Sequence, residues 1–430
     1  MFFSKKNKKS KSKTFKATPK SIIKAGFTSL FICFVLVGQS QSLETLLNDA
    51  AANNLQLKIL NTEYLAALER APQVNELPDP EASIGAFPFP VETRLGGQIT
   101  RISATQMFPW PGTLDSKKDL ELAKAKALYE RIEARKLNLF YEIKKPYFRL
   151  YEIQQSQKII RRNIAILEAL ERLALTKVES GKATAADVLR VQLKTEELKQ
   201  ELDILESAKT SPTASINQLL NRPLETEINI TDSLSFVNIP FNKNELTENI
   251  KANHPILQMF ELQQEISRQA ISLNELNGKP SFGAGMDYIT VRKRSDAEPS
   301  GNGRDILQLR ASIKIPLYRN KYSAKEREEE LKIAALEDRK ADVLLKYRTA
   351  IEKAFAESET ARLKTELYAK QIEITQAAIN ILEASYSTQG RDFDELLRLE
   401  KELVDYDLKI LKAVVQSHIA KAKVERYVAG

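Results

Sequence analysis

The sequence predicts a mainly α-helical protein with a small contribution of β-strands, built from two tandem copies of one plan. Three observations support this fold class: two very long segments almost free of glycine and proline, four segments of alternating apolar residues, and motifs that recur about 200 residues apart. Glycine and proline disfavour helices, and strands send alternate side chains to opposite faces. The 430 residues are therefore expected to form an elongated helical body with a sheet.

Residues 1–40 are predicted to be a secretory signal peptide. Residues 1–24 contain nine lysines and no acidic residue, residues 25–37 are apolar, and small residues follow, which places cleavage near Ser40. Cys33 is the only cysteine and lies inside the apolar run, which argues against lipidation and leaves the mature chain without a thiol. The remaining 56 basic residues are balanced by 57 acidic ones, so no nucleic-acid partner is expected.

Two repeats organise the rest of the chain. The segment ANNLQL at 52–57 corresponds to ANHPIL at 252–257, FPW at 108–110 to IPL at 315–317, and Gly181 to Gly390. The first repeat is assigned to 41–222, a linker to 223–245 and the second repeat to 246–430. Each repeat is expected to contain a strand pair followed by a long helical hairpin.

The long helices are predicted at 115–210 and 321–428, with Gly181 and Gly390 at the tips of the two hairpins. Residues after each tip follow a coiled-coil spacing of three and four. These residues are Val188, Val191, Thr195, Leu198, Leu202 and Leu205 in the first hairpin, and Leu396, Leu399, Leu403, Tyr406, Ile410, Ala413, Ser417, Ala420, Val424 and Tyr427 in the second.

Strands are predicted at about 82–91 and 98–108 in the first repeat, and at about 281–291 and 305–317 in the second. Pro88 and Pro90 weaken the first of them. Alternation gives each strand one apolar and one polar face, and the strand length suits a membrane β-barrel. Four strands cannot close a barrel alone, so several chains are expected to pool their strands.

In this order of elements the sequence resembles the outer-membrane efflux family typified by TolC. The motifs that carry the resemblance are the tandem repeat, INQLLNRP at 216–223, ESGKATAADVL at 179–189 and ERYV at 425–428. The resemblance implies a homotrimer with a twelve-stranded β-barrel and a periplasmic α-helical tunnel. It also implies a passive exit duct in the cell outer membrane, extending into the periplasm.

The partners that the resemblance implies are outer-membrane lipid, a periplasmic adaptor and a proton-driven inner-membrane efflux pump, which together form a tripartite pump. The adaptor is expected to dock at the hairpin tips, Gly181 and Gly390. The segment QMFPWPG at 106–112 is most similar to members that work with heavy-metal exporters. Within it, Trp110 is expected either at the membrane interface or packed under a tight turn.

A periplasmic gate is expected just beyond the hairpin tips. The family's acidic gate positions correspond to Asp187 in the first hairpin and Glu395 in the second, with Asp394 adjacent. Arginine occupies the next gate position in both hairpins, at Arg190 and Arg398, and Arg398 is expected to pair with a carboxylate on a neighbouring helix. The alternative is that all five are ordinary charges on helix surfaces.

The sequence contains no motif for catalysis, a cofactor or a metal. With two histidines in the whole chain and no cysteine in the mature chain, nucleophile–base pairs are scarce, so the chain is not expected to be an enzyme. Two alternatives to a channel remain, a periplasmic adaptor and a coiled-coil scaffold without a pore. An adaptor has one hairpin between soluble β-domains, and a scaffold leaves the strand faces without a role.

Overall fold

The computed structural model describes residues 42–389 and 392–428, so the predicted signal peptide and Gly390 lie outside it. The described chain is mainly helical with one small antiparallel sheet, as the sequence predicts. The helices are α1 (Leu43–Asn53), α2 (Leu55–Leu68), α3 (Arg70–Val74), α4 (Thr113–Glu179), α5 (Ala185–Ala208), α6 (Thr210–Leu219), α7 (Lys243–Asn253), α8 (Pro255–Asn277), α9 (Asn320–Gln389) and α10 (Phe393–Glu425). The strands are β1 (Glu81–Ala86), β2 (Glu92–Thr93), β3 (Gly96–Phe108), β4 (Ser281–Val291) and β5 (Ile306–Lys314).

Two helices, a strand pair and a helical hairpin follow one another in both halves of the described chain, where α3, β2 and α6 belong to the first half only, and the equivalent helices begin in the same way. Asn54 caps α2 by accepting a hydrogen bond from the Gln56 amide at 3.1 Å. His254, at the equivalent place before α8, accepts from the Ile256 amide through Nδ1 at 3.2 Å. A side-chain acceptor at this position satisfies an amide that the helix itself leaves unpaired. His254 is therefore a helix-capping residue.

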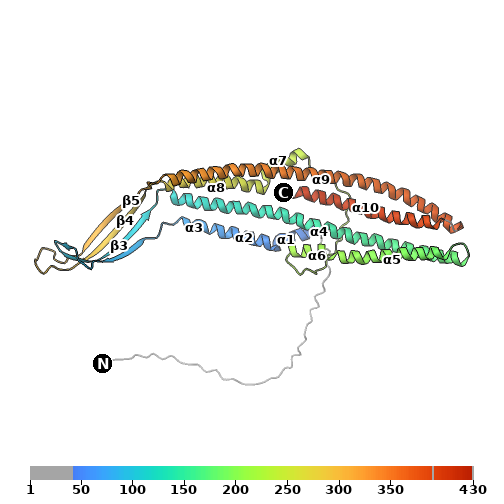
Figure 1. Cartoon of the computed structure of the whole chain (residues 1–430), viewed down its shortest axis with the longest axis horizontal. Coiled ribbons are helices and arrows are strands. Elements are labelled where there is room, and N and C mark those ends of the chain that lie inside the picture. The colour runs from blue at the N-terminus through green and yellow to red at the C-terminus, as the bar shows by residue number, and fades with distance from the viewer. Residues whose placement is uncertain (1–41, 390–391, 429–430) are drawn as a thin grey trace, which may run out of the picture. The chain divides into compact units, whose positions relative to one another are not determined.

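The helices pack as a single layer, four abreast along its length (Figure 1). Next to the sheet the order across the layer is α2, α4, α8 and α9, and towards the hairpin tips it is α5, α4, α10 and α9. The two longest helices, α4 with 67 residues and α9 with 70, run through both parts. At 1.5 Å per residue, each is about 100 Å long.

The coiled-coil residues of both hairpins face the interior of this layer. Val191, Leu396 and Val424 are completely covered, and no residue of the two predicted rows is exposed. The rows include Thr195 in the first hairpin and Ala413, Ser417 and Ala420 in the second, and these small side chains let neighbouring helices approach closely. The layer is therefore held together by burial of the predicted seams.

The sheet has the strand order β1, β3, β4 and β5, all antiparallel, with the short β2 paired to one end of β3. It lies at the end of the layer away from the hairpin tips (Figure 1). β4 has the predicted length, whereas β1 ends at Ala86 and β5 at Lys314, both earlier than predicted. Pro88 and Pro316 follow these ends, and proline cannot donate a ladder hydrogen bond.

The predicted linker crosses the helical layer as an extended segment from Pro223 to Asn242, without regular secondary structure. Its Ile228 and Ile230 are buried in a core formed with α4 and α6. Gln154 of α4 donates to the Ile228 carbonyl at 3.0 Å and accepts from the Ile230 amide at 3.3 Å. An isolated extended segment has no backbone partners for its amides and carbonyls. Side chains of the helices provide these hydrogen bonds here.

Candidate functional site at the hairpin tips

The first hairpin turns at Gly181, which has a φ of 71°. Its amide hydrogen-bonds to the Val178 carbonyl at 3.0 Å, and the neighbouring Lys182 amide bonds to the Lys177 carbonyl at 2.8 Å. A left-handed conformation at the end of a helix favours glycine because other residues carry a Cβ. The turn at the first tip therefore depends on Gly181.

Asp187 stabilises the first turn of α5 through its side chain. Its carboxylate accepts hydrogen bonds from the Thr184 amide and the Thr184 hydroxyl, both at 3.0 Å, and it also pairs with Arg190 at 3.3 Å. The Thr184 side chain completes a capping box with the α5 backbone. Asp187 is thus part of the helix cap, a role that the sequence analysis did not assign to it.

Arg190 connects the two hairpins. Its guanidinium pairs with Asp187 on its own helix and approaches Asp394 of α10, with Nε 3.7 Å from Oδ1. The Arg190 and Asp394 side chains are 53% and 81% exposed, so solvent screens their attraction. Three of the five predicted gate residues are therefore linked in one chain of charges.

Arg398 pairs along its own helix. Its partners are Glu395, to which it makes two hydrogen bonds, and Glu402, at 3.0 Å from Nη1. The guanidinium lowers the pKa of the Glu395 carboxyl below its ordinary value. Within the described part of one chain, Arg398 makes no pair with a neighbouring helix, and Arg190 occupies the bridging position that was expected of Arg398.

An apolar core joins the two hairpins beneath these charges. Val188 and Val191 of the first hairpin pack with Leu396 and Phe393 of the second, and Tyr386 is fully buried beside Phe393 with 4.5 Å between ring centroids. Lys177 Nζ also donates a hydrogen bond to the Ser387 carbonyl across the same boundary. Neither Tyr386 nor Lys177 departs from an ordinary helical pattern, so the sequence alone does not mark them as site residues.

Glu400 is an acidic residue inside this core. It is 3% exposed, and its Oε2 has no hydrogen-bond partner among the described residues. Burial, together with the charge of Glu383, raises the pKa of its carboxyl from 4.5 to about 6. A buried, unpaired carboxylate is costly, so Glu400 weakens the contact between the hairpins when it is ionised.

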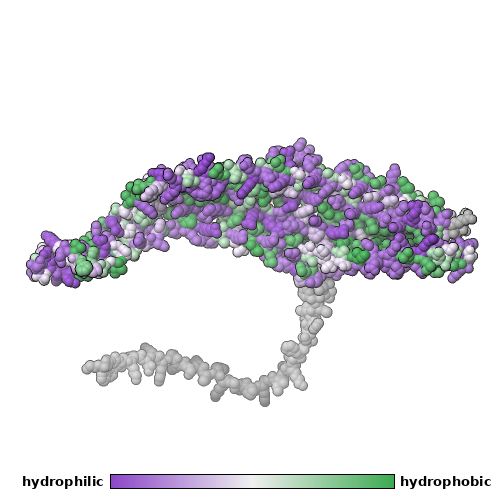
Figure 2. Space-filling model, in the orientation of Figure 1, coloured by the Kyte–Doolittle hydropathy of each residue, from purple (hydrophilic) through white to green (hydrophobic). Residues whose placement is uncertain are grey.

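The sheet presents one apolar face whose rows continue across all four strands. Ile84, Ile102, Tyr288 and Leu307 lie side by side in register, and so do Ala82, Ala104, Met286 and Leu309. Leu309 and Ile84 are 79% and 78% exposed. Figure 2 shows hydrophobic residues on the sheet and in patches along the helices. Alternation in the sequence predicted this face, and the register aligns it from strand to strand.

The opposite face of the sheet carries mostly polar and small residues, together with Ile289 and Ile306. Ser83, Ser103, Asp287 and Gln308 form one row, in which Asp287 is 2% exposed. At Gly283 an added Cβ would come within 2.3 Å of the Ser312 hydroxyl oxygen. A side chain at this position would therefore require the Ser312 and Met107 side chains to move.

Trp110 lies where the sheet joins the helices. Its ring centroid is 6.1 Å from that of Phe282 at the start of β4, and its carbonyl accepts from the Thr113 amide at 3.0 Å in the turn before α4. The Trp110 ring thus packs at this junction. The position suits both expectations for it, the membrane interface and packing under a tight turn.

The described residues hold no cluster of three or more histidine, cysteine or acidic side chains suited to a metal ion. None of the helices within 42–389 and 392–428 has the length and hydrophobicity of a membrane-spanning helix.

Comparison with solved structures identifies the class of fold. The chain has the fold of bacterial outer-membrane channels, as the resemblance to the TolC family predicts. One neighbour is the MtrE outer-membrane channel of Neisseria gonorrhoeae in its open state, with a TM-score of 0.70 and 15% identity over 90% of this chain and 89% of that one.

Other neighbours are equally similar. They include the outer-membrane protein VceC of Vibrio cholerae, with a TM-score of 0.68 and 13% identity over 90% of this chain and 96% of that one. CmeC, an outer-membrane channel of Campylobacter jejuni, has a TM-score of 0.67 and 12% identity over 90% and 85%. No protein-family model matches the sequence, and no curated protein matches it in a sequence search.

Proposed function

We propose that the chain is the outer-membrane channel subunit of a tripartite efflux pump and acts as a passive exit duct rather than as an enzyme. The observation that carries the proposal is the sheet, which has one continuous apolar face, one polar face and open edges at β1 and β5. Such a sheet is stable in lipid only if its edges are paired. The similarity in fold to outer-membrane channels supports the same conclusion.

Closure requires other copies of the chain. In the proposed homotrimer, β5 of one chain pairs with β1 of the next, and three sets of four strands give a twelve-stranded barrel. The apolar faces contact outer-membrane lipid, and the polar faces line the lumen. The helical layers then form a tunnel that extends into the periplasm.

The hairpin tips are the proposed periplasmic gate and docking end. They lie at the opposite end of the layer from the sheet (Figure 1), so the tips point towards the inner membrane. A periplasmic adaptor docks there on Gly181 and Gly390, and a proton-driven inner-membrane pump supplies the energy. Asp187, Arg190 and Asp394 form the intramolecular part of the gate, while Glu395 and Arg398 are available to neighbouring chains.

Neither alternative accounts for the observations as well. A periplasmic adaptor or a scaffold without a pore has no need for a sheet whose apolar face includes Leu309 at 79% exposure.

The test uses two arginine substitutions at adjacent positions on β5. Leu309 lies on the apolar face and Gln308 on the polar face. In a barrel, Leu309→Arg places a charge in lipid at a cost of about 2–4 kcal/mol per chain, whereas Gln308→Arg places it in the lumen. We expect wild type and Gln308→Arg to fractionate with the outer membrane as trimers, and Leu309→Arg to be depleted there.

The proposal fails if the wild-type mature chain is soluble and monomeric without detergent. It also fails if Leu309→Arg and Gln308→Arg reach the outer membrane in equal amounts.

A further inference from the structure

A cavity of about 720 Å³ lies between α4, α8 and α9, near the end of the layer that joins the sheet. Its floor is apolar and is formed by Leu120, Ile266, Ala270, Leu273, Ala335 and Leu336. Because α8 lies between α4 and α9, residues of all three helices can meet only on one side of α8. The cavity therefore opens on one face of the helical layer.

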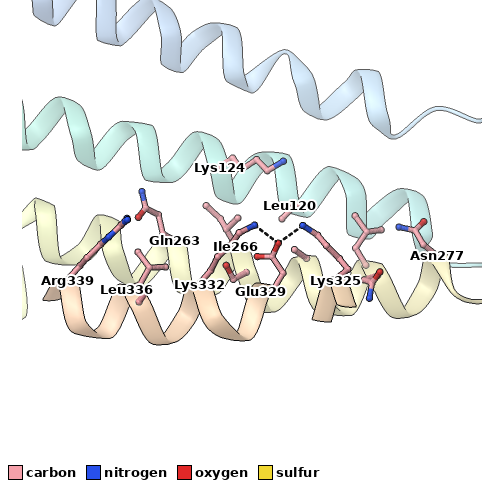
Figure 3. Close-up of a pocket in the computed structure, with 15 residues that line it drawn as sticks. Leu120, Lys124, Gln263, Ile266, Asn277, Lys325, Glu329, Lys332, Leu336 and Arg339 are labelled. Atoms are coloured by element: carbon pink, nitrogen blue, oxygen red, sulfur yellow. Dashed lines mark hydrogen bonds and ion pairs between the residues drawn. The ribbon is translucent and has the colours of Figure 1, made fainter. Parts of the chain in front are cut away.

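Two lysines are held in place at the cavity by a buried carboxylate. Glu329 is 4% exposed and pairs with Lys325 at 2.7 Å and Lys332 at 2.8 Å (Figure 3). Burial alone would raise the pKa of the Glu329 carboxyl, but hydrogen bonds from Lys325, Lys332 and Ser267 lower it to about 2. The carboxylate stays ionised and fixes both ammonium groups beside the apolar floor.

Arg339 adds a cation that the protein leaves unpaired. Its guanidinium lines the cavity beside Gln263 (Figure 3), and it has no ion-pair partner among the described residues. Lys124 lines the opposite wall and pairs with Glu121 at 2.6 Å. The lining thus contains four cations and one carboxylate, Glu329, and Glu328 beside the lining also pairs with Lys325 at 3.0 Å and with Lys332 at 2.5 Å. An unpaired cation next to an apolar floor suits a ligand with an acidic head and an apolar body.

We infer that this cavity binds an anionic amphiphile, with its carboxylate, sulfate or phosphate head at Arg339 and its apolar body on the floor below. The head gains a charge-assisted hydrogen bond, and the body covers the side chains around Ala270. If this face lines the tunnel of the proposed trimer, the cavity would hold acidic amphiphilic solutes or acidic lipid on the tunnel wall.

Binding is measured by calorimetry on the purified full-length chain in a neutral maltoside detergent. The probes are decyl sulfate, inorganic sulfate and decyltrimethylammonium, which separate the contributions of head charge and tail. We expect saturable binding of decyl sulfate, with weaker binding of the other two. Arg339→Gln should weaken decyl sulfate binding about tenfold, since one charge-assisted contact is lost.

Arg348→Gln is the matched control. Arg348 is an exposed arginine nine residues further along α9, and at 100° per residue it lies on the opposite side of the helix from Arg339. Ala270→Phe is a second variant that fills the floor and leaves every charge in place. We expect normal binding in Arg348→Gln and loss of binding in Ala270→Phe, with trimer content and circular dichroism unchanged in both.

The inference is overturned if Arg339→Gln and Ala270→Phe bind decyl sulfate like wild type, or if decyltrimethylammonium binds equally well. Competition by dihexanoyl phosphatidylglycerol, but not by dihexanoyl phosphatidylcholine, would identify a lipid head as the ligand. Competition by neither would identify a soluble acid. Because the assay needs neither a membrane nor a pump, its failure is distinct from mislocalisation, which would overturn the proposed function.

Discussion

Glu400 shows how one residue can make the contact between the hairpins sensitive to pH. Its carboxyl is buried, and its pKa is raised to about 6 by burial and by Glu383. A group whose pKa is higher in the folded state stabilises that state when it is protonated. The stabilisation is complete below about pH 4.5, the ordinary value, and is lost as the pH rises through about 6.

Replacing Glu400 with glutamine should therefore stabilise the protein at neutral pH. A shift of about 1.5 pKa units corresponds to about 2 kcal/mol per chain above pH 7, and the gain should vanish below about pH 4.5. The measurement is urea unfolding of Glu400→Gln and wild type across this pH range. Glu402→Gln is the control, because Glu402 is at the surface beside Arg398 and should give no such gain. Parallel pH profiles for Glu400→Gln and wild type would contradict the assignment.

Arg190 is the residue that we expect to influence the gate most. It alone among the predicted gate arginines reaches the other hairpin, at Asp394, whereas Arg398 pairs along α10. An exposed pair contributes up to about 1 kcal/mol, and a trimer has three copies. Arg190→Ala should raise the open fraction of channels in planar bilayers more than Arg398→Ala does. The reverse order would show that contacts between chains, made by Arg398, control the gate.

Sequence reasoning found the charged residues at the tips but not their individual roles. Asp187 and Arg190 correspond to gate positions of the family that the sequence resembles, Asp394 is adjacent to another, and the structure brings the three together. Glu400 was missed, although Leu397 and Val404 flank it at spacings of three and four. That spacing marks a second buried row, and only the packing of the two hairpins reveals that a carboxylate in this row lacks a partner.

At the scale of elements, the linker depends on hydrogen bonds from the helices it crosses. Gln154 pairs with both the carbonyl of Ile228 and the amide of Ile230, and Tyr151 accepts from the Leu234 amide at 3.0 Å. On α10, Ser417 accepts from the Val237 amide at 3.2 Å. The linker therefore ties α4 of the first repeat to α10 of the second.

Gln154→Ala should release the middle of the linker. The change removes two hydrogen bonds to partly buried backbone groups, at a cost of about 1–3 kcal/mol. We expect a lower free energy of unfolding and faster cleavage after Glu227 by a glutamate-specific protease. Gln155→Ala is the control, because this neighbouring side chain makes no hydrogen bond in the described structure. Equal cleavage of both variants would show that Ile228 and Ile230 hold the linker without Gln154.

The elements themselves were largely predictable from the sequence, and the exceptions have local causes. The scarcity of glycine and proline on both sides of Gly181 and in 321–428 predicts the helices of the two hairpins. The alternating pattern located the strands but overestimated the lengths of β1 and β5. Prolines near the ends of these two strands stop the pairing, although apolar residues continue beyond them. The path of the linker could not be predicted, since its partners come from distant helices.

At the scale of the whole molecule, the helical layer has two free edges, and both are apolar. On α9 the exposed apolar residues are Leu331, Leu345, Leu363, Leu367, Ile374 and Ile381, which at 100° per residue fall within about 40° of one another. On α5, Leu189, Leu193 and Ile204 lie opposite the seam that packs on α4. Complementary stripes on opposite edges favour a head-to-tail contact that closes into a ring.

This arrangement predicts that charges on the α9 stripe disrupt the trimer without unfolding the chain. Ile374 and Ile381 are 60% and 70% exposed in a single chain, so the double change Ile374→Glu and Ile381→Glu costs little there. In a ring it removes about 1.5–3 kcal/mol of apolar burial per residue and places carboxylates against the neighbour's leucines. Light scattering in detergent should show monomers for the double variant and trimers for wild type.

Gln376→Glu is the matched control, since it adds a carboxylate to an exposed position on another side of the same helix, away from the stripe. It should remain trimeric. The monomeric double variant should keep the helical circular dichroism of wild type, because the intramolecular seams that hold α9 to α10 and α8 are unchanged. If instead the double variant stays trimeric, the α9 stripe is not the contact between chains, and ring closure would have to rely on the strand edges alone.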